Sequence, residues 1–175
     1  MASSRSNEEL SDLLVKAALN DPAIAVPGFD ASRIFALISV LLSSPSSPKK
    51  KLVAQMKTVY QFKIENGEGQ KAVWVVDMKK RGRVQVVPQG EKPSPKPDVT
   101  IEMNDRDCVG LATGTYNPQK LYAAKRVKVR GNLDRALLVE KIITHERQKI
   151  ESYADPRKRS GDTGRWTSGA GKAKL

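Results

Sequence analysis

The first third of the chain carries two apolar helical patterns. In residues 8–19 apolar side chains recur at helical spacing, which predicts an amphipathic helix that ends at Asn20-Asp21-Pro22. The stripe consists of Leu10, Leu13, Leu14, Ala17 and Ala18. Since the opposite face is acidic and anionic lipid would repel it, we expect the stripe to pack on the protein itself. Residues 33–42 are apolar nearly all round, which predicts a buried helix, and a short basic helix is expected over residues 49–58.

From residue 60 onward, apolar and polar residues alternate in the manner of strands. Four runs predict strands over residues 60–65, 72–78, 83–87 and 99–103, the first two joined by the turn at Asn66–Gly69. The second run is apolar on both faces, so we expect it to be central in its sheet.

Helical signals return after the fourth strand. Asn104 is suited to cap a helix over residues 105–112, and Asn117-Pro118 opens a short one. A last strand over residues 126–130 precedes a helix from residue 133 to about residue 150. Residues 155–175 are polar and Gly-rich, and we expect them to be disordered. Strands enclosed by helices predict the α+β class, with one mostly antiparallel sheet.

Composition narrows the class of protein. The 175 residues include 31 Lys and Arg against 19 Asp and Glu, a formal net charge of +12. The longest apolar run falls short of the ~20 residues that cross a bilayer, so we expect no membrane-spanning helix. The first residues lack the pattern of a secretory signal, so we expect none there. One cysteine, Cys108, excludes an intrachain disulfide and indicates a reducing compartment.

Catalytic groups are sparse. His145 is the one histidine and stands beside charged neighbours, which is typical of a solvated side chain. Cys108 lies among apolar residues and is interpreted as a small buried hydrophobe, while Asp105 and Asp107 are better suited to helix capping than to paired acid–base work. No phosphate loop or metal motif is visible, so we expect neither an enzyme nor a cofactor or metal site. The sequence suggests no role for Trp166.

Residues 62–132 contain a series of short motifs in a fixed order. They are Phe62-Lys-Ile with Asn66-Gly67, Trp74-Val-Val-Asp77, Asp98–Met103 leading into Asp105-Arg-Asp107, Thr113-Gly114 with Asn117-Pro-Gln119, and Val127–Asn132. In this order and spacing the segment resembles the sterol carrier protein type-2 lipid-transfer domain. The resemblance implies a five-stranded sheet covered by helices, an apolar tunnel for fatty acids, fatty acyl-CoA, sterols or phospholipids, and no covalent chemistry. It places the lipid-binding domain at residues 28–150, between an N-terminal helical extension, 1–27, and a tail, 151–175.

The resemblance and the apolar pattern together give candidates for the tunnel wall. They are Phe62, Trp74, Met103, Val109, Gln119, Leu121 and Leu137. Core packing is an equal alternative for each apolar member, because periodicity does not separate core from cavity wall. Ala123 stands where the family usually has an aromatic residue, and we expect the smaller side chain to widen or redirect the wall.

The last three residues, Ala173-Lys174-Leu175, are a close variant of the Ser-Lys-Leu peroxisomal address. Family members often end in such a tripeptide. We therefore expect recognition by a peroxisomal import receptor and a location in the peroxisomal matrix.

The leading hypothesis is a non-enzymatic lipid carrier for fatty acids or fatty acyl-CoA. Its basic surplus could also attract anionic membrane surfaces or the phosphates of acyl-CoA. Two alternatives stay open: a protein-interaction module with a vestigial tunnel, and a basic nucleic-acid-binding protein. Few aromatic residues and scattered basic clusters argue against nucleic acid.

Overall fold

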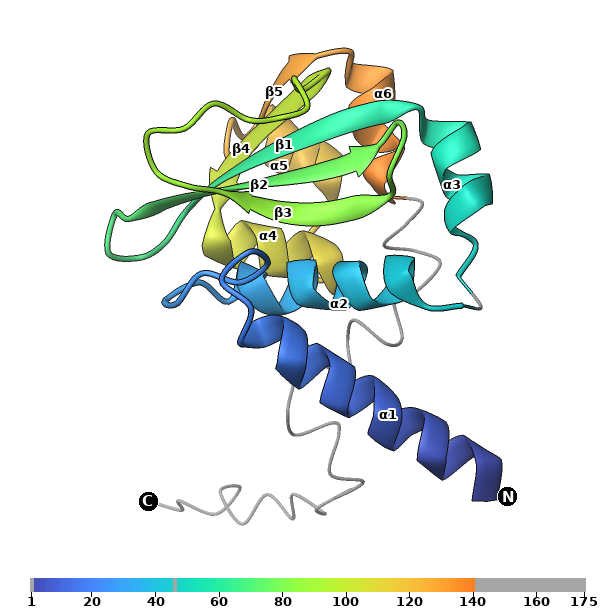
Figure 1. Ribbon diagram of the computed structural model, residues 1–175. Helices are drawn as coiled ribbons and strands as arrows, with labels where there is room; N and C mark the ends of the chain where they lie inside the picture. The colour runs from blue at the N-terminus through green and yellow to red at the C-terminus, as the bar shows by residue number, and fades with distance from the viewer. Residues whose placement is uncertain (1, 46, 141–175) are drawn as a thin grey trace, which may run out of the picture.

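The computed structural model describes residues 2–45 and 47–140, and within them five strands form one sheet (Figure 1). The strand order is β3-β2-β1-β4-β5; β1 and β4 are parallel and the other neighbours antiparallel. The predicted five-stranded, mostly antiparallel α+β fold is confirmed, and β2 has neighbours on both sides as expected. The strands are β1 (Thr58–Glu65), β2 (Lys71–Met78), β3 (Arg83–Val87), β4 (Val99–Asn104) and β5 (Lys128–Gly131).

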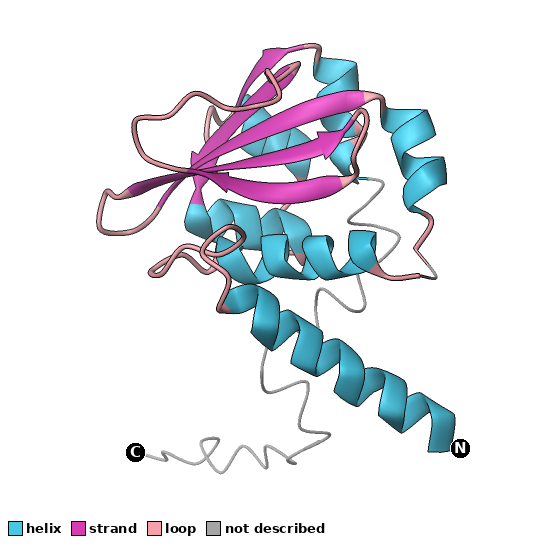
Figure 2. Cartoon of the chain, in the orientation of Figure 1, coloured by secondary structure: helices cyan, strands magenta, loops and turns pink. Residues whose placement is uncertain are grey.

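Helices gather on one face of this sheet, as Figure 2 shows. The long α2 lies beside α4, and the short α5 and α6 complete the layer. The predicted last helix extends beyond residue 140 and so leaves the described residues, as do His145, Trp166 and the tail. The helices are α1 (Ala2–Leu19), α2 (Ala31–Ser43), α3 (Lys49–Met56), α4 (Asp105–Ala112), α5 (Pro118–Ala123) and α6 (Leu133–Leu137).

Aromatic packing joins the sheet to α2. Strand register places Phe62 opposite Trp74 on one neighbour and Ile101 on the other, so all three side chains share the inner face. The Trp74 ring stacks on Phe35 of α2 at 4.6 Å, and its indole N–H donates to the Ile24 carbonyl at 2.7 Å. Trp74 therefore connects the sheet, α2 and the segment before α2.

The prediction for the contact face of the first helix is only partly right. α1 packs on the domain as expected, against α2, and Ala18 of the expected stripe is buried there together with Val15; Leu10, Leu13, Leu14 and Ala17 are exposed. The reason is geometric: the N-terminal part of α1 projects beyond α2 and has no domain surface beneath it (Figure 1). An apolar stripe marks a helix but does not fix where its partner ends.

Candidate functional site

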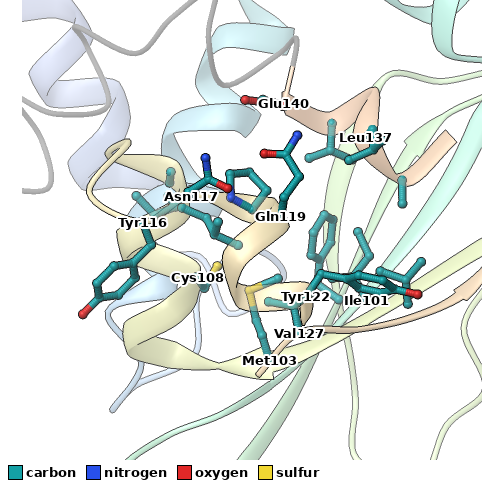
Figure 3. A pocket seen from close by; sticks show the side chains of 18 of the residues that line it. Ile101, Met103, Cys108, Tyr116, Asn117, Gln119, Tyr122, Val127, Leu137 and Glu140 are labelled. Atoms are coloured by element: carbon teal, nitrogen blue, oxygen red, sulfur yellow. The ribbon is translucent and has the colours of Figure 1, made fainter. Parts of the chain in front are cut away.

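An apolar cavity of about 460 Å³ lies between the inner face of the sheet and the helical layer (Figure 3). This volume is within the roughly 300–1,000 Å³ typical of small-molecule sites. The sheet contributes Phe62, Ile101, Met103 and Val129, with Val127 just before β5; α2 contributes Ile34, Phe35 and Ile38; α4 contributes Cys108, Leu111 and Ala112. The rest of the lining comes from Gly114–Gln119, Tyr122, Leu133, Ala136, Leu137, Val139 and Glu140.

Four of the seven candidate wall residues line this cavity: Phe62, Met103, Gln119 and Leu137. The other three lie outside the lining. Trp74 is fully buried against α2, Leu121 is buried in the core, and Val109 is half-buried against that core. The inner face of β2 contacts α2 directly, whereas the cavity opens over β1, β4 and β5. Alternation along a strand shows which face is apolar but does not show whether that face meets a helix or a cavity.

Sequence reasoning missed two parts of the wall. The first is α2, where one face packs on the sheet while Ile34 and Ile38 reach the cavity. The apolar character of this helix on every side was the sequence signal that could have indicated this second contact. The second is the α4–α5 connection with Tyr116. Ala123 is exposed and does not line the cavity; its neighbour Tyr122 does, so the expectation for Ala123 was wrong.

A buried carboxylate fixes α2 over the cavity. Asp105 accepts hydrogen bonds from the backbone N–H groups of Asp30 and Ala31 at 2.8 and 2.7 Å. The capping role expected for Asp105 therefore serves the start of α2 rather than its own helix. Its own helix is capped by Asn104, whose side chain accepts from the Asp107 N–H, as predicted.

A second carboxylate fixes the opposite wall. Asp107 is fully buried and forms an ion pair with Arg126, whose Nε donates to it at 3.1 Å. The Arg126 guanidinium lies 5.4 Å from the centre of the Tyr116 ring, and a Cβ on Gly110 would clash with that ring. Gly110 and the ion pair thus hold Tyr116, and the loop that lines the cavity, against α4.

The lining combines a long apolar surface with polar groups toward one end. Figure 3 shows Asn117, Gln119 and Glu140 in one part of the cavity and Met103, Cys108 and Val127 in another. Burial, and then the charges of Asp105 and Asp107, raise the pKa of the Cys108 thiol to about 12. Cys108 is therefore a protonated, apolar wall group rather than a nucleophile.

Within residues 2–45 and 47–140, no group of three or more His, Cys, Asp or Glu side chains is placed to hold a metal ion. No helix in this part of the chain is long and apolar enough to cross a membrane. The arrangement is suited to enclosing a hydrocarbon chain, with a polar head beside the polar lining residues.

Comparison with known proteins agrees with this geometry. The model of the SCP-2 sterol transfer family matches residues 38–144. Sterol carrier protein 2 from Bos taurus is 34% identical over 119 residues, which are 67% of this chain and 21% of the relative, so the chain spans about a fifth of that longer protein.

Two shorter relatives are matched over nearly their whole length. The oleate-induced peroxisomal protein POX18 of Candida maltosa is 32% identical over 120 residues, 69% of this chain and 91% of the relative. A fatty acid-binding protein of Yarrowia lipolytica is 30% identical over 132 residues, 73% and 99% of the two chains. The solved structure of apo sterol carrier protein 2 from Yarrowia lipolytica superimposes with a TM-score of 0.63 at 28% identity, covering 69% of this chain and 94% of that one.

Proposed function

The chain belongs to the SCP-2 sterol transfer family, and from this membership and the cavity we propose that it is a non-enzymatic carrier of fatty acids or fatty acyl-CoA. The apolar cavity of about 460 Å³ is the observation that carries the proposal. We identify it with the lipid tunnel expected from the sequence, with Phe62, Met103 and Leu137 contacting the acyl chain. The names of the relatives, one a fatty acid-binding protein and one oleate-induced, favour acyl ligands.

Burial of hydrocarbon supplies the driving force. Each methylene group removed from water contributes ~0.8 kcal/mol, so a long acyl chain gains on the order of 10 kcal/mol before the cost of association. Affinity should therefore rise with chain length until the cavity is filled. A carrier needs such binding to be reversible, and nonspecific apolar contacts meet that requirement.

The polar end of the cavity bears on the head group. Thr115, Asn117 and Gln119 offer uncharged hydrogen-bonding groups, whereas Glu140 is the one acidic or basic side chain among the described lining residues. A free carboxylate at that end would be repelled by Glu140, and an ester would not. Glu140→Gln should therefore strengthen binding of oleate and leave binding of methyl oleate unchanged.

Titration with a fluorescently labelled fatty acid tests the proposed function. We expect saturable binding near one ligand per chain and displacement by unlabelled oleate or oleoyl-CoA. Failure of unlabelled lipids to displace the probe would remove the proposal. A titration with duplex DNA at low and high salt addresses the nucleic-acid alternative, for which steep salt dependence without lipid uptake is the signature.

We further propose that the protein works in the peroxisomal matrix, delivered by an import receptor that binds Ala173-Lys174-Leu175. These residues lie outside the described part of the chain. Support comes from the tripeptide itself and from two relatives with peroxisomal names, POX18 and the peroxisomal multifunctional enzyme A of Dictyostelium discoideum. A fluorescent protein fused to the N-terminus should accumulate in peroxisomes, and deletion of the tripeptide should leave it in the cytosol.

A further inference from the structure

Two basic segments that lie far apart in the sequence meet in space. Residues 49–51, all lysines, begin α3, and residues 79–81, Lys-Lys-Arg, form the turn that joins β2 to β3. A Cβ placed on Gly82 would lie 2.6 Å from Cε of Lys49, so the Lys49 side chain lies directly against the end of this turn. Figure 1 shows α3 beside the same turn. The fold therefore unites the two segments in one basic cluster, which consists of Lys49, Lys50, Lys51, Lys79, Lys80 and Arg81.

Negative charge near this cluster is scarce. Lys79 pairs with Asp98 at 3.2 Å, and the buried carboxylate of Asp77 accepts the backbone N–H groups of Lys79 and Lys80. The other five basic side chains form no ion pair with a described residue, and all of these five except Lys49 are exposed. No member of the cluster lines the cavity, so lipid binding there does not account for it.

Ser47 stands immediately before the cluster, in the sequence Ser47-Pro48-Lys49-Lys50. Its hydroxyl oxygen accepts a hydrogen bond from the Lys49 N–H at 3.1 Å, so the hydroxyl group is held beside the first lysine of α3. A serine that is followed by proline, with a basic residue three positions after the serine, is the kind of sequence that proline-directed protein kinases modify. The segment therefore combines a modifiable hydroxyl group with a cluster of positive charge.

The chain holds two other serines that precede proline, Ser44 and Ser94. The residue three positions after Ser44 is Ser47, and the residue three positions after Ser94 is Pro97. Neither is basic, so Ser47 alone among the three has the charge pattern that such a kinase prefers.

The backbone around Ser47 is accessible. None of residues 43–45 and 47–51 is buried, and Ser47 itself lies in the connection between α2 and α3. The buried side chain of α3 is that of Met56, at the end far from Ser47. A kinase binds its target as an extended segment, and the first turn of α3 can unwind for this purpose without exposing core side chains.

We propose that Ser47 is a phosphorylation site whose phosphate is bound by the basic cluster. A proline-directed kinase transfers the phosphoryl group from ATP: the Ser47 hydroxyl oxygen bonds to the γ-phosphorus, its proton is released, and the bond to the β-phosphate oxygen breaks to give ADP. The product carries a charge of about −1.5 to −2 at pH 7. Charge-assisted hydrogen bonds from α3 and from the β2–β3 turn then hold these two segments together through the phosphate.

Treatment of the full chain with a cyclin-dependent kinase and ATP tests the site. We expect incorporation of one phosphate per chain, which peptide mass spectrometry places on Ser47. Ser47→Ala should lose this incorporation, and Lys50→Gln should slow it because the basic residue three positions after the serine is gone. The matched control is Ser94→Ala, which removes an exposed serine that also precedes proline and should be modified at the parental rate. No incorporation into the folded chain, or incorporation at Ser44 or Ser94 in place of Ser47, would overturn the proposal.

Titration of the phosphate tests where it lies. In ³¹P NMR we expect its second pKa to be lower in the folded chain than in a phosphorylated peptide of residues 44–53, because Lys80 and Arg81 adjoin it only in the fold. Lys80→Gln with Arg81→Gln should raise this pKa toward that of the peptide. The matched control is Lys120→Gln with Lys128→Gln, an exposed pair on α5 and β5, and β5 is the edge strand opposite β3. A folded chain that titrates like the peptide, or equal shifts for the two pairs, would overturn the assignment of the phosphate to the cluster.

This proposal is independent of the carrier function. Because the cluster lies outside the cavity lining, the phosphorylated chain should bind oleate as the unmodified chain does. If the chain binds oleate but is not phosphorylated at Ser47, the modification site is wrong and the carrier function stands. If it is phosphorylated there but takes up no fatty acid, the carrier function is wrong.

Discussion

Filling the cavity from α4 should block the ligand without harming the fold. Ala112 is 1% exposed and lines the cavity at the end of α4. Ala112→Leu adds about three carbon atoms to a space that we assign to the acyl chain, and at ~0.8 kcal/mol per displaced methylene the ligand loses about 2.4 kcal/mol. This loss corresponds to an increase of about 60-fold in the dissociation constant for oleate.

The assay is competition against a fluorescent fatty acid, paired with urea denaturation of each variant. A leucine that enters an empty cavity should leave the free energy of unfolding unchanged or raise it, whereas overpacking a filled core costs about 1–3 kcal/mol. Ala54→Leu, on the exposed side of α3, adds the same atoms away from the cavity and should change neither quantity. A stable Ala112→Leu protein with parental affinity for oleate would refute the reasoning.

Three further predictions concern the supporting structure. Asp107→Asn should lower the free energy of unfolding by about 1–3 kcal/mol in urea denaturation, because it breaks a pair in which Asp107 is buried while Arg126 is partly exposed; a negligible loss would contradict this. The carboxylate of Asp98 accepts a hydrogen bond from the Val59 N–H, which is the main cause that lowers the pKa of Asp98 below 3.8. The ionised carboxylate therefore stabilises the fold fully above that pH, and this stabilisation is lost as the pH falls through the lower pKa of the folded state. The stability difference between the parent chain and Asp98→Asn should shrink accordingly in acid, and a difference independent of pH would exclude this linkage. With a pKa of about 12, Cys108 should react slowly with iodoacetamide at neutral pH and more slowly still when oleate is bound; equal rates with and without oleate would place the ligand elsewhere.

Alternation predicted the strands and their faces best where the outer face is polar, as at Lys63 and Glu65 of β1; β2 is buried on both faces, with Trp74 and Val75 both fully buried. The register that sets Phe62 between Trp74 and Ile101 is the outcome of that pattern. Short helices were predictable from their caps: the side chains of Asn104 and Asn117 accept backbone hydrogen bonds at the starts of α4 and α5.

Contacts between distant segments were not predictable in this way. Asp105 binds the start of α2 at Ala31, 74 positions earlier in the chain, and nothing near residue 105 in the sequence identifies this partner. The same limit explains why Trp74 was assigned to the tunnel wall although it packs on Phe35, and why the leucines of α1 were expected to be covered. Local pattern determines which side of an element is apolar, and tertiary structure determines whether that side meets core, cavity or solvent.

The most direct test of the central claim is to locate the acyl chain. Nuclear Overhauser effects between ¹³C-labelled palmitate and methyl groups of the protein would show which residues surround it. The account predicts contacts to the methyl groups of Met103, Ile101 and Leu137 and none to Val75, which lies on the opposite face of the sheet. Contacts confined to other surfaces, with none to these three residues, would contradict it.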